Sequence, residues 1–260
     1  GTVFSTSFTY LGIVSGNTYD FYVTAVENGG LGPYKSTSNI VNSDVRTALI
    51  SPDFNYFNWA TVVDDQQIDL RFTIDTIADV TSYKIQRSTS KVGPFVTIES
   101  VDKYQGMETV VDYSDNNVNT DRSVYFYQIE IVNDICGFDS NFSNLASTIL
   151  VKVTSSSLNA INRVSITEYV DWDYGVLKYD VYRAVGGVWE TTPITSLPAF
   201  SDTMTYVDDV SKVLDGDGEF CYKVITLEKG TFIESASNVA CALHEPILYV
   251  PNAFIPGGLY

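Results

Sequence analysis

The sequence Val124-Tyr-Phe-Tyr-Gln-Ile-Glu-Ile131 decides the fold of this chain. Its apolar residues Tyr125, Tyr127 and Ile129 recur at every second position, which places them on one face of a β-strand. A polar loop follows, and Ser143-Asn-Leu-Ala146 then begins a second short strand. The pattern predicts a β-hairpin that turns one face toward a hydrophobic core.

The same pattern occurs three times along the chain. Aligning Tyr19, Tyr125 and Phe220 puts a Ser-Asn pair 19, 18 and 17 residues later, and the repeat interval is 106 and then 95 residues. An interval of about 100 residues is the size of one β-sandwich domain. The other two copies are Thr18-Tyr-Asp-Phe-Tyr-Val-Thr-Ala25 with Ser38-Asn-Ile-Val41, and Glu219-Phe-Cys-Tyr-Lys-Val-Ile-Thr226 with Ser237-Asn-Val-Ala240. Their alternating positions Tyr19, Phe21 and Val23, and Phe220, Tyr222 and Val224, are expected to face a core.

The residues upstream of the second and third copies also agree with one another. Each copy has an earlier strand that ends in arginine, then a turn, then a strand that precedes the final hairpin. Trp172 is placed to fill the core of the third copy. These segments are Ser82–Arg87 and Lys178–Arg183 for the earlier strand, Lys91–Pro94 and Val185–Val188 for the turn, and Val110–Tyr113 and Tyr206–Asp209 for the later strand.

With its paired aromatics and Ser-Asn start of the last strand, the repeat resembles strands F and G of fibronectin type III domains. The expected fold class is therefore all-β, with tandem immunoglobulin-like antiparallel sandwiches. The expected domains are residues 1–46, the C-terminal part of one sandwich, then 47–152 and 153–245, each a whole sandwich, and 246–260. Only Gly1 to Gly16 precede the first copy, so its missing strands are expected upstream. Short linkers are expected at Val45–Ser51 and Val151–Ser157, which would make a moderately stiff rod.

The last part of the chain reads Tyr249-Val-Pro-Asn-Ala-Phe-Ile-Pro256. This sequence resembles the opening of the C-terminal sorting domain of Bacteroidota proteins exported by type IX secretion. There the usual sequence is Tyr-Val-Pro-Asn-Ala-Phe-Thr-Pro followed by Asn-Gly-Asp-Gly; here Ile255 replaces the Thr, and Gly257-Gly258-Leu259 stands where the turn would begin. The resemblance implies a secreted, cell-surface protein whose partners are the type IX translocon, the surface-attachment machinery and upstream domains of the same chain. The matching residues are Tyr249, Val250, Pro251, Asn252, Ala253, Phe254 and Pro256.

Composition excludes several classes of partner. The chain has 15 Lys and Arg against 32 Asp and Glu, a net charge of −17, which repels nucleic acid and anionic lipid surfaces. No apolar run is long enough to span a membrane. The excess of acidic residues is expected to keep the protein soluble; the alternative is that some of them bind divalent cations. The single histidine, His244, removes most His-based catalysis and most zinc sites.

The three cysteines allow at most one disulfide. Cys221 and Cys241 lie on the two strands of the last hairpin, where hydrogen-bonded neighbours would face each other away from the core. Paired cysteines at these strands also recur in the final repeat of the family resembled, and such a bridge fits an exported protein. The alternative is two unpaired small apolar residues. Cys136 has Asp134 and Asp139 nearby rather than bases, which favours a structural role over a nucleophile.

Two further groups of residues are candidate sites. Asp215, Asp217 and Glu219 cluster carboxylates in a Gly-rich turn, which suits calcium but is also ordinary turn chemistry; no other cofactor is expected. Asp75-Thr-Ile77 and Asp202-Thr-Met204 resemble the short O-glycosylation motif of Bacteroidota proteins, which would make Thr76 and Thr203 sugar acceptors.

The sequence carries no recognisable catalytic motif, so the expected function is non-enzymatic. The first hypothesis is a stalk or spacer region of a large cell-surface adhesin or gliding-related protein. The alternative is an accessory or carbohydrate-binding region of a secreted polysaccharide-degrading enzyme, with surface glycans as partners. Trp59, Trp172 and Trp189 are candidates for stacking on sugars, although Trp172 fits a core position better.

Overall fold

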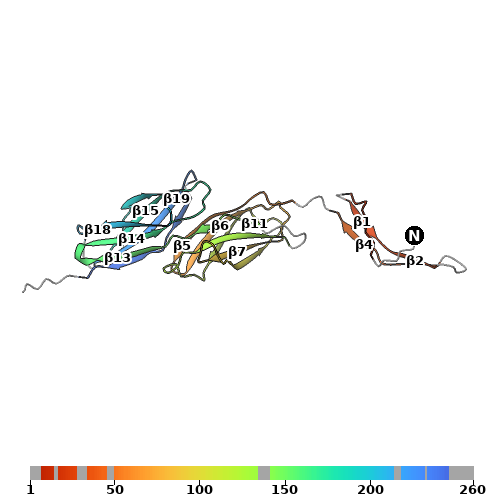
Figure 1. Ribbon diagram of the computed structural model, residues 1–260, viewed down its shortest axis with the longest axis horizontal. Coiled ribbons are helices and arrows are strands. Elements are labelled where there is room, and N and C mark those ends of the chain that lie inside the picture. The colour runs from red at the N-terminus through yellow and green to blue at the C-terminus, as the bar shows by residue number, and fades with distance from the viewer. Residues whose placement is uncertain are drawn as a thin grey trace, which may run out of the picture. The chain divides into compact units, whose positions relative to one another are not determined.

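The computed structural model describes residues 7–14, 17–27, 34–45, 50–133, 141–213, 218–231 and 233–245 (Figure 1). These residues form antiparallel β-sheets, and the one helical element among them is a 3₁₀ turn at Ser157–Asn159. No described helix has the length and apolar character that crossing a membrane requires. The chain divides into two compact units, Gly1–Ser51 and Pro52–Tyr260.

The first unit contains two small antiparallel pairs. Strand β1 (Thr18–Phe21) pairs with β4 (Val41–Asp44), and β2 (Thr24–Val26) pairs with β3 (Lys35–Thr37). The expectation that its alternating apolar residues are buried is wrong: Phe21 is 40% exposed and Val23 72% exposed. The physical reason is that no second sheet covers this hairpin within the described part of the unit.

The second unit begins with a complete sandwich, which we call the second sandwich. One sheet has the order β5-β6-β9 and the other the order β11-β10-β7-β8, with β12 also paired to β10. Its core lies between the two sheets and contains Phe57, Leu70, Phe72, Ile85 and Tyr127, all without exposed surface. The strands are β5 (Asn55–Asp64), β6 (Gln67–Ile74), β7 (Ser82–Ser88), β8 (Val96–Asp102), β9 (Val110–Asp115), β10 (Phe126–Val132), β11 (Asn141–Phe142) and β12 (Ala146–Ser147).

The third sandwich repeats this architecture in the same unit. One sheet has the order β13-β14-β18, and the other the order β16-β15-β19-β20, with β17 on β15 and β21 on β19. Tyr179, Val181, Phe220, Tyr222 and Val224 fill its core. The strands are β13 (Val151–Ser156), β14 (Ile161–Thr167), β15 (Val176–Val185), β16 (Val188–Trp189), β17 (Thr195–Pro198), β18 (Thr203–Asp209), β19 (Glu219–Glu228), β20 (Glu234–Ala236) and β21 (Ala240–Leu243). The predicted fold class, tandem antiparallel sandwiches, is confirmed.

The linker expected at Val151–Ser157 is wrong. Residues Val151–Ser156 form strand β13, which pairs with β14 over six residues, so the boundary between residues 152 and 153 cuts through a strand. Val151 is buried against the third core and Val153 packs against it, while the Ser and Thr side chains lie at more exposed positions. A polar edge strand that alternates in this way resembles a Ser-rich linker in composition, and only its pairing distinguishes the two.

The Ser-Asn pair makes the same contacts in all three copies. The serine Oγ accepts a hydrogen bond from the N–H of Val23, Ile129 or Val224 at 2.9 Å in each case. The same hydroxyl donates to the carbonyl of the asparagine that follows it. Each serine N–H also donates to the carbonyl of the same strand residue. The pair therefore fixes where the last strand meets the long strand before it, which explains why its spacing recurs.

A second repeated feature is a buried polar triad in both complete sandwiches. In the second sandwich, Arg87 donates to both oxygens of Asp115 at 2.7 and 2.9 Å, and Tyr127 donates to the same carboxylate at 3.0 Å. Arg87 and Tyr127 are direct partners in the β7–β10 register. The carboxylate thus accepts three hydrogen bonds from these two side chains inside the protein, as a buried charge requires.

The third sandwich has the equivalent triad of Arg183, Asp208 and Tyr222. The guanidinium lies 2.9 and 3.1 Å from the carboxylate oxygens, and the phenol donates at 2.8 Å. Asn162 donates to Tyr222 Oη at 2.8 Å, and the ring of His244 bonds to Asn162 Oδ1 at the same distance. The triad is therefore extended into a buried chain of polar groups across this core.

Candidate functional site: the junction of the two complete sandwiches

The most elaborate polar and aromatic arrangement in the second unit joins its two sandwiches. The loop between β14 and β15, residues 168–175, packs against β5, which is an edge strand of its sheet. An edge strand presents unpaired backbone groups, and a protein must cover or pair them. Here the loop of the next sandwich satisfies them.

Tyr169 and Trp172 are the aromatic centre of this junction. Both side chains are buried, and their ring centroids lie 4.0 Å apart. Tyr169 Oη accepts a hydrogen bond from the N–H of Ala60 at 3.1 Å, and Trp172 Nε1 donates to the carbonyl of Asn58 at 2.7 Å. Each ring therefore combines apolar burial with a bond to the β5 edge, as buried Tyr and Trp usually do.

A β-bulge prepares β5 for these contacts. The β5–β6 register shifts between Phe57 and Trp59, so Asn58 has no partner residue in the ladder. Such an extra residue changes the direction of the backbone groups next to it. The carbonyl of Asn58 accepts a hydrogen bond from the indole N–H of Trp172, which belongs to the third sandwich and not to the β5–β6 ladder.

Strand β20 covers the same edge further along. Ser235 Oγ donates to the carbonyl of Ala60 at 2.7 Å, and the N–H of Ala236 donates to Thr61 Oγ1 at 2.8 Å. Both backbone groups of Ala60 are therefore bonded to the third sandwich. A buried backbone group without a partner costs about 1–3 kcal/mol, so separating the sandwiches would be unfavourable unless water replaced these partners.

Other bonds widen the contact around this centre. Asn144 Nδ2 donates to the carbonyl of Asp171 at 2.9 Å, and the N–H of Val170 donates to Ser147 Oγ at 3.0 Å. Asn238 Nδ2 lies 3.2 Å from Asp121 Oδ1. These bonds come from several loops of both sandwiches, which opposes bending in more than one direction.

The junction also holds phenols that resist ionisation. Tyr56 Oη accepts the N–H of Asp173 at 3.0 Å, and burial raises the pKa of Tyr56 to about 12, helped by the nearby Glu228 carboxylate. Burial also raises the pKa of Tyr169, although the hydrogen bond from Ala60 acts in the opposite direction. Burial therefore favours the neutral phenol at both positions.

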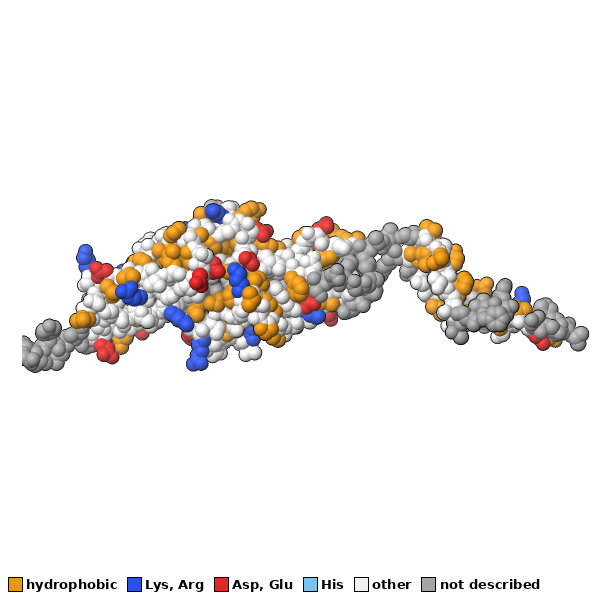
Figure 2. Space-filling view, in the orientation of Figure 1, with side chains coloured by type: hydrophobic (Ala, Val, Ile, Leu, Met, Phe, Trp, Pro, Cys, Tyr) orange, Lys and Arg blue, Asp and Glu red, His pale blue; other side chains and the backbone are white. Residues whose placement is uncertain are grey.

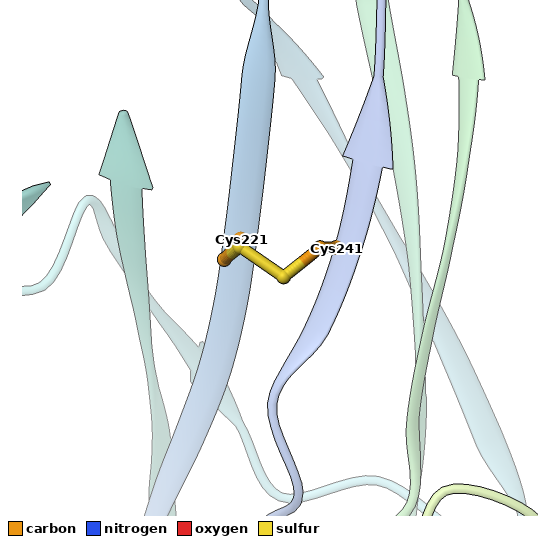
Figure 3. Close-up of a disulfide and its surroundings, with 2 residues drawn as sticks. All are labelled: Cys221 and Cys241. Atoms are coloured by element: carbon orange, nitrogen blue, oxygen red, sulfur yellow. A yellow bond between two sulfur atoms is a disulfide. The ribbon is translucent and has the colours of Figure 1, made fainter. Parts of the chain in front are cut away.

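The two cysteines expected to pair are joined in the structure. Cys221 and Cys241 are direct partners in the β19–β21 register, and a disulfide of 2.07 Å links them (Figure 3). Their Cα atoms are 4.0 Å apart. Phe220 and Tyr222 on either side are fully buried, so Cys221 points away from the core, as the alternation indicates.

The candidate calcium turn is only partly described. Glu219 is exposed at the start of β19, and its carboxylate lies near the two bridged sulfurs, which are not available as metal ligands. Asp215 and Asp217 lie outside the described residues. The calcium proposal therefore stays a prediction.

The two candidate sugar acceptors differ in their surroundings. Asp75 is buried, and its carboxylate accepts the N–H groups of Asp53, Ile77 and Ala78, which commits it to organising its own loop. Thr76 is half-buried beside it. Thr203, in contrast, is exposed at the start of β18.

The tryptophans do not form one platform for sugars. Trp172 belongs to the third core and the junction. The ring of Trp59 has the guanidinium of Arg71 over it at 5.3 Å, and the ring of Trp189 has Lys223 Nζ over it at 4.7 Å. In both Trp59 and Trp189, a cation–π contact therefore occupies one face of the ring.

Cys136 and the motif at Tyr249–Pro256 lie outside the described residues. Sequence reasoning missed Tyr169, the bulge at Asn58 and the role of β20. One signal was present, because Tyr169 and Trp172 are two large aromatics in a polar loop.

Comparison with known proteins adds little to this description. No protein-family profile matches the sequence, and no curated protein matches it. Among solved structures, the chain is similar to the FN1–FN3 domains of chicken CNTN1, with 12% identity and a TM-score of 0.27. The match covers 87% of this chain and 77% of the other. The strand order and register of the chain itself define its fold.

Proposed function

We propose that this chain is a non-enzymatic spacer in a cell-surface protein, built of fibronectin type III-like sandwiches. The observation that carries the proposal is the junction at β5, where the third sandwich bonds both backbone groups of Ala60 and packs Tyr169 and Trp172 against the same edge. A spacer needs neighbouring domains that keep a fixed direction, and a junction of this kind supplies it. The acidic surface limits association between copies.

The mechanical part of the proposal is tested by NMR relaxation on the whole chain. In the parent protein, backbone amides of the second and third sandwiches should report one rotational correlation time. The variant Trp172→Ala with Tyr169→Phe should give two shorter times, because it removes the ring packing and two hydrogen bonds of the junction. Tyr174→Phe is the matched control, since Tyr174 is exposed in the same loop. Equal times in the double variant and the parent would contradict the proposal.

We further propose that the protein reaches the surface by type IX secretion. The support is the resemblance of Tyr249–Pro256 to a sorting-domain opening, on a chain whose repeats suit an extracellular stalk. Removing everything from Tyr249 to the end of the full gene product should abolish surface delivery and leave the protein inside the cell. Surface labelling followed by fractionation measures this. Normal delivery of the truncated protein would refute the export proposal and leave the spacer proposal standing.

A further inference from the structure

A polar groove lies between the second and third sandwiches, beside their junction. It has a volume of about 570 Å³, which falls within the usual range for small-ligand sites. One wall comes from the β7–β8 loop and the segment before β10, and the other from the end of β14 and the start of β18. Figure 2 shows basic and acidic side chains close together on one face of this two-sandwich unit.

The groove is held in shape before any ligand arrives. Thr167 and Thr203 are partners in the β14–β18 register, and the N–H of Glu168 donates to the carbonyl of Asp202 at 2.8 Å. Lys91 Nζ reaches across from the second sandwich to Glu168 Oε1 at 3.7 Å. A preformed site loses less conformational entropy when it binds.

The lining has the chemistry of a sugar site. Five of the lining residues carry a hydroxyl, which can both donate and accept a hydrogen bond; that of Thr167 already accepts the N–H of Leu150 at 2.9 Å. Val124 and Phe126 contribute an apolar floor of half-buried side chains, which suits the C–H face of a sugar ring. The hydroxyl residues are Thr89, Ser90, Ser123, Thr167 and Thr203.

Arg122 gives the groove a preference for a carboxylate. The chain has about twice as many acidic as basic residues, and Arg71, Arg87 and Arg183 each bind a carboxylate. Arg122 lines the groove, and no carboxylate within the described residues lies at ion-pair distance from it. Its fork of N–H donors matches a carboxylate. Two carboxylates also line the groove: Glu168, which is paired with Lys91 at 3.7 Å, and Asp202. The lining therefore holds as many acidic as basic side chains, and the preference for a carboxylate rests on the guanidinium of Arg122 alone.

We propose that this groove binds a short acidic oligosaccharide, with a uronate carboxylate on Arg122 and ring hydroxyls on the Thr and Ser side chains. An acidic peptide is the weaker candidate, because its charged side chains offer no C–H face to Val124 and Phe126; the test below separates the two ligands. This binding function goes beyond the spacer proposal and does not depend on it.

The test is isothermal titration calorimetry of the whole chain with tetragalacturonate. We expect a Kd of about 1 mM or tighter. Arg122→Gln should weaken binding by about tenfold or more, because a hydrogen-bonded charge is lost. Thr203→Val, which leaves the charge unchanged, should weaken it by a smaller factor. Arg163→Gln is the matched control: Arg163 is exposed on β14 outside the groove, and its variant should bind as the parent does.

Several outcomes would overturn the proposal. These are no detectable binding of tetragalacturonate, equal weakening by Arg122→Gln and Arg163→Gln, equal binding of the uncharged galactose tetrasaccharide, or equal binding of a tetra-aspartate peptide. NMR relaxation of the same variants checks that the two sandwiches still tumble together. If they do and no sugar binds, only the binding proposal fails, because the rigid junction is then intact.

Discussion

Asn144 holds the backbone of Phe57 from both sides. Its Oδ1 accepts the N–H of Phe57 at 2.7 Å, and its Nδ2 donates to the carbonyl of the same residue at 3.1 Å. Asn238 makes the same pair of bonds to Val151, at 2.7 and 3.1 Å. In the second and third sandwiches, the asparagine of the Ser-Asn pair therefore ties the last strand to the first strand, which belongs to the opposite sheet.

Replacing Asn238 by Ala should destabilise the third sandwich. The change leaves the N–H and carbonyl of Val151 without partners in a buried place, which costs about 1–3 kcal/mol in the free energy of unfolding. Urea denaturation followed by fluorescence measures the loss. Asn39→Ala is the matched control, because Asn39 occupies the same place in the first copy but is exposed there, and an exposed substitution changes stability by about 0.5 kcal/mol or less. Equal losses for the two variants would contradict the assigned role.

Opening the Cys221–Cys241 disulfide should lower the free energy of unfolding of the third sandwich by about 3 kcal/mol. The bridge closes a loop of 20 residues, and the unfolded chain gains conformational freedom when the loop opens. The measurement compares urea midpoints with and without reductant, in a background where Cys136 is replaced by Ser to prevent thiol exchange. The double variant Cys221→Ala with Cys241→Ala should be insensitive to reductant. A midpoint that does not move on reduction would refute the prediction.

Replacing Tyr222 by Phe should cost about 1–3 kcal/mol of stability. The phenol donates to Asp208 and accepts from Asn162, and both groups are buried. Without it, a buried carboxylate loses a donor and a buried amide loses its acceptor. Thermal unfolding measures the change. Tyr182→Phe serves as the control, since Tyr182 is half-buried on the neighbouring strand β15 and lies outside this network. If the two variants melt alike, the triad contributes nothing to stability.

The carboxylate of Asp75 should make the second sandwich sensitive to acid. Burial alone would raise the pKa of Asp75, but the N–H donors of Asp53, Ile77 and Ala78 and the charge of Lys103 lower it below its ordinary value. A carboxyl with a lower pKa in the folded state stabilises the protein above the unfolded value of about 3.9. That contribution is lost as the pH falls through the folded-state pKa. The parent should therefore lose stability in acid more steeply than Asp75→Asn.

Urea denaturation across a pH series below about 5 measures this difference. Asp102→Asn is the control, because Asp102 is exposed at the end of β8, and its variant should follow the parent curve. Parallel pH curves for the parent and Asp75→Asn would show that the buried carboxylate carries no acid sensitivity.

Local pattern was enough to predict the long strands around Tyr125 and Phe220. Alternation around Tyr125 and Phe220 places their neighbours on the correct faces, because a strand turns successive side chains to opposite sides whatever it packs against. The opposition of Cys221 and Cys241 follows from the same rule and the position of the hairpin loop. The Ser-Asn spacing marks the last strand because its hydrogen bonds are short-range within one hairpin.

Local pattern failed wherever a strand or a backbone group pairs with residues that are distant in the sequence. The run at Val151–Ser156 has the composition of a linker, and it is a strand because β14 pairs with it. The N–H of Ala60 is bonded by Tyr169, 109 residues later, and its carbonyl by Ser235, 175 residues later. No periodicity encodes such a contact.

The sequence by itself determined that this chain is a series of antiparallel sandwiches, since strand periodicity and hairpin spacing are local properties. The tertiary structure decided that two of these sandwiches form one unit, with a covered edge strand at β5 and a polar groove beside the junction. The physical reason is that the backbone groups of an edge strand are paired, and the walls of a groove are formed, by residues that are distant in the sequence and meet only in the folded chain. The proposed spacer and binding functions both depend on those long-range contacts.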